Sequence, residues 1–168
     1  MRSAAPICLV VAFALPATAQ DAPRASEILE AARAECIADV KAADPNAPTP
    51  ELLVENEALS FWDLDQYGAE DDAILDFNFV FCSLNFSLWH GSGGSIIHVI
   101  HNGTTSRSWT GGLWEVATFN ESPVLLIGRH GTWCDGYGAQ PCIQAITLFE
   151  EGHSTVLDPL PLEERPAQ

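Results

Sequence analysis

The sequence is short of basic residues: 7 Lys and Arg stand against 23 Asp and Glu in 168 residues, for a net charge of −16. A surface this acidic repels the phosphates of nucleic acids and of anionic lipids. The composition therefore argues against nucleic-acid binding. It favours a soluble product whose partner is a cation or a basic protein.

The sequence also lacks an apolar run long enough to span a bilayer, which takes roughly 20 residues. The apolar run near the start covers only residues 7–15, after Arg2 and before the small-residue pattern Ala17-Thr18-Ala19. This arrangement is typical of a secretory signal peptide, predicted here over residues 1–20. We expect export to the periplasm or beyond, with no membrane insertion after cleavage.

A third absence is that of any Cys-x-x-Cys pair, which argues against a zinc site made of cysteines. Four cysteines follow the predicted signal peptide: Cys36, Cys82, Cys134 and Cys142. An even number in an exported chain indicates disulfides, and four cysteines allow three pairings. Cys134 and Cys142 enclose a loop with Gly and Pro and are easily joined, which leaves Cys36 for Cys82.

The pattern of apolar residues predicts one helix followed by strands. A helix is expected over residues 26–43, capped by Ser26, with Cys36 in its buried stripe. Strands are expected over 58–62, 73–82, 96–101, 104–109, 113–119, 124–130 and 143–149, with a short edge strand at 155–157. Short turns between them, such as Asn102-Gly103, favour antiparallel pairing.

The expected fold class is therefore α+β: an N-terminal helix packed on an antiparallel β-meander sheet and stapled to it by a disulfide. In the strand over 73–82, Leu75, Phe77, Phe79 and Phe81 should face the helix. We expect a single domain over residues 21–157 and a Pro-rich, flexible tail over 158–168.

The loop between the first two expected strands is dense in carboxylates. Asp63, Asp65, Gly68 and Asp71 reproduce most of the spacing D-x-D-x-D-G-x-x-D, in which oxygens surround a calcium ion and glycine allows the turn. Tyr67 occupies the fifth position, where the pattern has a carboxylate. The twelfth position is apolar, so the bidentate glutamate of an EF-hand is absent.

This loop resembles the calcium loops of integrin-type FG-GAP repeats and of small exported proteins with a DxNxDGxxD hairpin. The resemblance implies that Asp63, Asp65 and Asp71 are ligands, with Asp72 as a spare. It implies weak calcium binding, in the range of extracellular modules. An acidic turn with no ion is the alternative.

A wider resemblance covers residues 63–142. Four of its features are similar to those of a group of uncharacterised small exported proteins of Gram-negative bacteria. They are the acidic loop, the strand ending in Cys82, the glycine-rich turn His90-Gly91-Ser92-Gly93-Gly94-Ser95 and the segment His130-Gly131-Thr132-Trp133-Cys134 through Cys142. In that group the glycine-rich turn carries two cysteines, here at the positions of His90 and Ser95. The resemblance implies a fold and an exported location, and it implies no activity.

The histidines offer no obvious metal site. His98 and His101 lie three apart in an expected strand, so their side chains should point to opposite faces of the sheet. A hydrolase-type site could be assembled from His90, Ser92, His130 and Asp135 only if the fold brought them together.

Three functions follow as expectations. The first is an exported acidic binding module without catalytic activity, engaging a basic periplasmic or extracellular protein as periplasmic lysozyme inhibitors do. The second is a hydrolase-type enzyme using the four residues above. The third is a structural module stabilised by calcium. The tryptophans Trp62, Trp89 and Trp133, which flank expected turns, are candidates for an exposed binding face.

Overall fold

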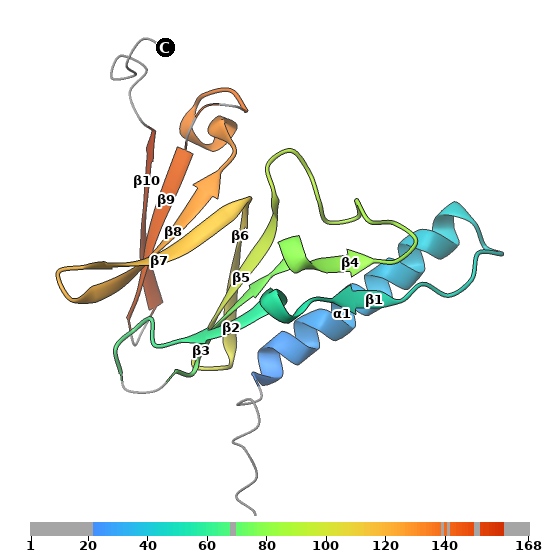
Figure 1. Cartoon of the computed structure of the whole chain (residues 1–168), viewed down its shortest axis with the longest axis horizontal. Coiled ribbons are helices and arrows are strands. Elements are labelled where there is room, and N and C mark those ends of the chain that lie inside the picture. Colours follow the sequence, from blue (N-terminus) through green and yellow to red (C-terminus); the bar gives the residue numbers. More distant parts are fainter. Residues whose placement is uncertain (1–21, 68–69, 139, 141, 150–151, 160–168) are drawn as a thin grey trace, which may run out of the picture.

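The computed structural model describes residues 22–67, 70–138, 140, 142–149 and 152–159 (Figure 1). The predicted signal peptide, residues 1–20, lies outside the described residues. Among the described residues, one α-helix and ten strands form an α+β fold in which all strand pairs are antiparallel. No helix among them is long and apolar enough to cross a membrane.

The helix α1 (Pro23–Ala43) buries the stripe that the sequence predicts. Ala25, Ala32, Cys36 and Val40 are buried against the sheet. The predicted cap at Ser26 is wrong, because the helix begins three residues earlier with Pro23 at its first turn and Ala22 as the capping residue. Proline is well placed there, since its fixed φ suits a helix start and its missing N–H would have no partner.

The central layer is a four-stranded sheet in the order β2-β3-β5-β6, built from β2 (Leu59–Trp62), β3 (Asp72–Asp76), β5 (Ser95–His101) and β6 (Thr105–Gly111). One face packs on α1 through residues such as Ala73, Leu75 and Ile100. The other face contributes Ile74, Ile97 and Val99 to a second core. Every residue of β3 is buried, because β3 is an inner strand covered on both faces.

A second four-stranded sheet forms the third layer, in the order β10-β9-β8-β7. Its strands are β7 (Leu113–Phe119), β8 (Ser122–Arg129), β9 (Cys142–Phe149) and β10 (Gly152–Pro159). Leu125, Ile127 and Ile146 pack against the central sheet, so this sheet and α1 lie on opposite sides of it (Figure 1). In place of the single sheet expected from the sequence, the described residues form these two packed four-stranded sheets and a separate two-stranded sheet.

The expected strand over 73–82 is interrupted. A 3₁₀ turn, η2 (Phe77–Phe79), separates β3 from β4 (Val80–Cys82). The Asp76 side chain causes the break locally, because its Oδ1 accepts hydrogen bonds from the backbone N–H and the side-chain amide of Asn78. The turn changes the alternation of faces: Val80 and Cys82 join the core beneath α1, and the prediction that Phe81 faces the helix is wrong.

A short strand that the sequence did not reveal, β1 (Leu52–Val54), pairs with β4. Both preferred disulfides are present. Cys36–Cys82 joins α1 to β4, and Cys134–Cys142 joins the 3₁₀ turn η3 (Gly131–Cys134) to β9. The remaining 3₁₀ turn, η1 (Asn56–Ala58), leads into β2.

The last described strand is longer than predicted. β10 runs over Gly152–Pro159 rather than 155–157, and it includes the first two residues of the expected tail. It is held by an eight-residue register with β9. Residues 160–168 of the expected tail lie outside the described part of the chain.

Candidate functional site

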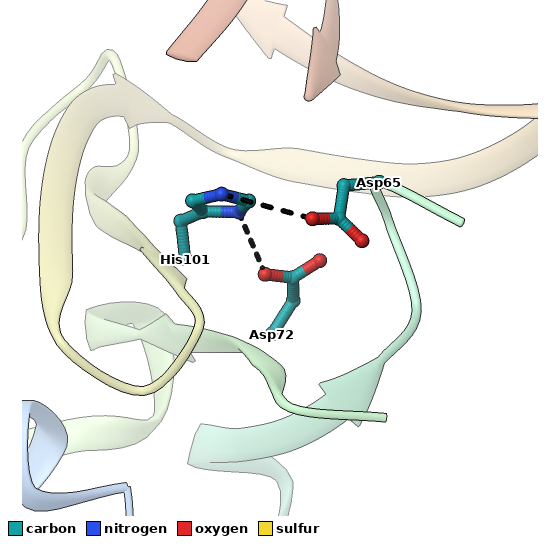
Figure 2. A group of neighbouring side chains, drawn as sticks. All are labelled: Asp65, Asp72 and His101. Carbon is teal, nitrogen blue, oxygen red and sulfur yellow. Dashed lines mark hydrogen bonds and ion pairs between the residues drawn. The ribbon is translucent and has the colours of Figure 1, made fainter. Parts of the chain in front are cut away.

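The acidic loop and the end of β5 meet where the two inner strands of the central sheet begin and end, and there Asp65, Asp72 and His101 form a compact cluster (Figure 2). One ligand-type atom from each residue lies within 4.8 Å of the others. Asp65 comes from the loop after β2, Asp72 opens β3, and His101 closes β5. The cluster depends on the β3–β5 pairing, which sets Ala73 opposite Ile100.

Asp72 organises the cluster from its buried centre. Its carboxylate accepts hydrogen bonds from the backbone N–H of Leu64 at 2.9 Å, the backbone N–H of Asn102 at 3.0 Å and Nδ1 of His101 at 3.0 Å. The residue is fully buried. Burying a carboxylate is costly unless donors surround it, and here three donors do. Asp72 thereby ties together the acidic loop, β3 and the β5–β6 turn.

The His101 ring is oriented from both sides. Nδ1 faces Asp72, and a carboxylate can only accept, so Nδ1 carries a proton. On the other side the amide nitrogen of Asn102 lies 3.0 Å from Nε2. Amide N–H groups donate, so Nε2 presents a lone pair in this arrangement. A histidine with Nδ1–H on a carboxylate and an unprotonated Nε2 has a tautomer that metal-binding histidines adopt.

Asp65 completes the cluster and leaves one oxygen without a donor. Its Oδ1 accepts a hydrogen bond from the backbone N–H of Tyr67 at 2.9 Å. Its Oδ2 is buried, has no hydrogen-bond partner in the part of the chain that the structure describes, and lies 3.7 Å from Nε2 of His101, which is too long for a hydrogen bond. The Asp65 side chain is only 2% exposed. A buried carboxylate oxygen without a donor is unusual and calls for a compensating positive charge.

The loop that carries Asp65 is anchored on both sides of this residue. Leu64 is buried in the core between the two sheets. The side-chain amide of Gln66 donates to the backbone carbonyl of Glu121 in the β7–β8 hairpin. Asp65 is therefore held in place before any ligand binds.

The predicted calcium ligands do not all gather here. Asp65 and Asp72 are in the cluster, and Asp63 and Asp71 are not grouped with them among the described residues. Asp71 instead lines a shallow cavity with residues such as Pro23 and Phe61. Asp72, the expected spare, lies in the cluster and Asp71, an expected ligand, does not, because neighbouring residues at the start of a strand point to opposite faces. Asp63 has one buried oxygen, for which the described residues supply no hydrogen-bond partner.

The sequence did not single out His101 as part of a site. The prediction that His98 and His101 point to opposite faces is confirmed, since Phe77 contacts His98 within the core beneath α1 while His101 faces the acidic loop. What the sequence did not supply was the pairing of β5 with β3, which alone brings His101 to the loop. The adjacent Asn102-Gly103 turn was the available signal, because it places His101 at a strand end.

The residues of the hydrolase alternative occur in different surroundings. Ser92 and His130 line the same shallow cavity of about 220 Å³, but His90 and Asp135 do not. His90 makes its hydrogen bond to the backbone carbonyl of Val80 at 3.0 Å, and His130 makes its own to the hydroxyl of Thr132 at 2.8 Å. No hydrogen bond joins any two of the four among the described residues. The arrangement offers no activated nucleophile there.

Of the three tryptophans proposed for an exposed face, only Trp133 is exposed, at 54%. Trp89 is buried and packs edge-on against Phe77, and its ring N–H donates to Glu35 at 3.0 Å. Trp62 packs edge-on against Trp114 between the sheets. Core packing accounts for Trp62 and Trp89.

A different apolar surface lies on the outer face of the second sheet, away from the core. In the strand register, Leu113, Gly128 and Ile143 form one row across β7, β8 and β9. Leu113 is 81% exposed and Phe119, farther along β7, is 76% exposed. We call this surface the outer face; its apolar members are Leu113, Ala117, Phe119, Val124, Leu126, Ile143 and Ala145.

We compared the chain with protein-family models, with curated proteins and with solved structures, and none of the three comparisons found a match.

Proposed function

We propose that this protein is an exported acidic binding module and that the cluster of Asp65, Asp72 and His101 takes a divalent metal ion of the zinc type. The observation that carries the proposal is the pair of facing atoms, Oδ2 of Asp65 and Nε2 of His101, 3.7 Å apart. The first is a buried oxygen without a donor among the described residues. The second is a ring nitrogen that accepts a hydrogen bond from the exposed amide of Asn102, which an ion would displace.

The separation of the two atoms suits a shared ion. Zinc lies about 2.0–2.2 Å from histidine nitrogen and carboxylate oxygen, so ligand atoms 3.7 Å apart would subtend about 120° at the ion, near the tetrahedral value. Asp72 would act from the outer shell by holding Nδ1–H of His101. Water would complete the coordination, and the exposed Asn102 side chain would turn aside.

The imidazole decides which ion is expected. Calcium takes oxygen ligands almost exclusively, whereas imidazole suits zinc, copper and nickel. A site with one nitrogen and one carboxylate oxygen therefore favours a transition metal over the calcium that the loop spacing suggests. Calcium binding would need Asp63 and further oxygens to enter the site.

Equilibrium dialysis against Zn²⁺ should find one ion per chain in the native protein and a large loss of affinity in His101→Gln. Replacing an outer-shell partner costs about 10–100-fold in affinity, and replacing a ligand should cost at least as much. Bound zinc should also raise the melting temperature of the native protein, because it binds only the folded state.

The matched control is His98→Gln. His98 lies three residues away on the other face of β5, and burial, with a further contribution from the charge of Arg24, lowers its pKa to about 4. It is therefore neutral at pH 7, and its replacement changes no charge. Equal zinc affinity in the two variants would contradict the proposal, as would calcium binding that His101→Gln leaves intact.

The outer face supports a second function, the docking of a protein partner. We infer that the partner presents an apolar patch that also carries lysine or arginine. The outer face is mostly apolar, the exposed Glu115 lies within it on β7, the exposed Glu121 lies in the β7–β8 turn, and the chain carries a net charge of −16. Exposed apolar patches rimmed by polar residues mark interaction sites. Acidic rims steer basic partners and make the association salt-sensitive.

Photo-crosslinking in the exporting cell can test this docking surface. A benzoylphenylalanine at position 119 should form an adduct with one basic protein, which mass spectrometry identifies. The yield of this adduct should fall at high salt and when Leu113→Ser is added. The same probe at position 33, on the exposed side of α1, should not form it. A self-adduct, no adduct, or the same adduct from both positions would refute the inference.

A further inference from the structure

Arg129, near the end of β8, is a buried cation that the metal site and the outer face do not use. The residue is 8% exposed, although arginine is rarely buried without an ionic partner. It points to the inner face of the second sheet, where the register pairs it with Cys142 of β9. A buried guanidinium has lost its contact with water, so contacts inside the protein have to offset that loss.

Those contacts are neutral. One terminal nitrogen donates to the side-chain oxygen of Gln144, and the guanidinium carbon lies 4.4 Å from the centre of the Trp133 ring. Nε is buried and has no acceptor among the described residues. None of the ion pairs among the described side chains involves Arg129, even in a chain with 23 acidic residues. Burial lowers the pKa of the guanidinium, as expected for a charge removed from water.

Arg129 also lines a cavity of about 400 Å³ at the junction of the two sheets. The other lining residues come from β6, η3 and β9: Ser108, Trp109, Thr110, Trp133 and Gln144. The volume is in the range of small-molecule sites. Indole rings provide apolar walls, hydroxyl and amide groups provide polar contacts, and the guanidinium provides the one charge.

We propose that this cavity binds a small monoanionic ligand, a carboxylate on a flat apolar or aromatic body, with the carboxylate on Arg129. The guanidinium fork matches a carboxylate geometrically and would give Nε its missing acceptor. The apolar body would lie against the indole rings. A single cation inside a strongly acidic chain favours a monoanion over a doubly charged phosphate.

Titration calorimetry with benzoate tests the proposal, with benzamide as the neutral analogue and inorganic phosphate as the competing oxyanion. Benzoate should bind with one-to-one stoichiometry in the millimolar range or tighter, and benzamide at least tenfold more weakly. Arg129→Gln should lose benzoate binding by at least tenfold. Arg107→Gln, at an exposed arginine of β6, is the matched control and should bind benzoate as the native protein does.

Protection of the native protein from phenylglyoxal gives a readout that does not depend on the folding of a variant. Benzoate should slow modification of Arg129 and leave that of Arg107 unchanged, as read by peptide mass spectrometry. Equal affinity for benzoate and benzamide, tighter binding of phosphate, unchanged binding in Arg129→Gln, or no saturable binding at millimolar benzoate would each overturn the proposal.

Discussion

Replacing Cys36 and Cys82 together by alanine is expected to lower the free energy of unfolding by about 4 kcal/mol. The disulfide closes a loop of 46 residues, and on the chain-entropy model a cross-link stabilises more as its loop lengthens. Both cysteines are also in the core beneath α1, so the helix loses its covalent tie to β4. Urea unfolding followed by circular dichroism measures the change.

The matched control is the Cys134→Ala and Cys142→Ala pair. That disulfide closes a loop of only 8 residues, for which the same model gives about 2.5 kcal/mol. Removing Cys36–Cys82 should therefore lower the free energy of unfolding by about 1.5 kcal/mol more than removing Cys134–Cys142. Equal losses, or a larger loss from the short loop, would show that loop entropy does not govern the contribution of these disulfides.

Replacing Asp72 by alanine is expected to destabilise the protein by about 3 kcal/mol or more, because it leaves buried donors without an acceptor at roughly 1–3 kcal/mol each. The donors are the backbone N–H groups of Leu64 and Asn102 and the ring N–H of His101. The loss should appear in thermal and urea unfolding, and zinc affinity should fall with it because His101 is no longer oriented.

Asp71→Ala is the control for Asp72→Ala, since it removes the neighbouring carboxylate from the same loop. Asp71 is partly exposed and lies outside the cluster, so its loss should change stability by no more than about 0.5 kcal/mol. If Asp71→Ala were the more damaging change, the assignment of Asp72 as the organising carboxylate would be wrong.

The sequence predicts much of the local structure. The buried stripe of α1 follows from apolar residues at helical spacing, and β7 matches its expected bounds of 113–119. The Asn102-Gly103 turn has positive φ at both residues, as the favoured hairpin turn requires. The pairing of the four cysteines follows from the short spacing of Cys134 and Cys142, which leaves Cys36 for Cys82.

The arrangement of strands was harder to predict. Alternation predicts which residues are buried in a strand but does not say which strands pair, so one sheet was expected where two are packed together. The break at η2 arose because the Asp76 side chain competes for a backbone N–H group, which ends the ladder locally. A change of one residue in the alternation reverses which side chains face the core, and this is why Val80 and Phe81 exchange places.

The same reasons limit what the sequence says about the site. Spacing in the acidic loop identified Asp65, but it preferred Asp71 to Asp72, because Asp71 stands at the ninth position of the calcium-loop pattern. His101 is 29 residues from Asp72 and meets it only through the pairing of β3 and β5. Arg129 carried no sequence signal, since its burial at the junction of the two sheets depends on how these sheets pack.

The central claim is that Asp65 and His101 share a metal ion, and anomalous diffraction from crystals grown with zinc tests it most directly. Data collected on both sides of the zinc edge should show one peak between Oδ2 of Asp65 and Nε2 of His101, about 2.0–2.2 Å from each. No peak at this cluster, or a peak only at other side chains, would contradict the claim.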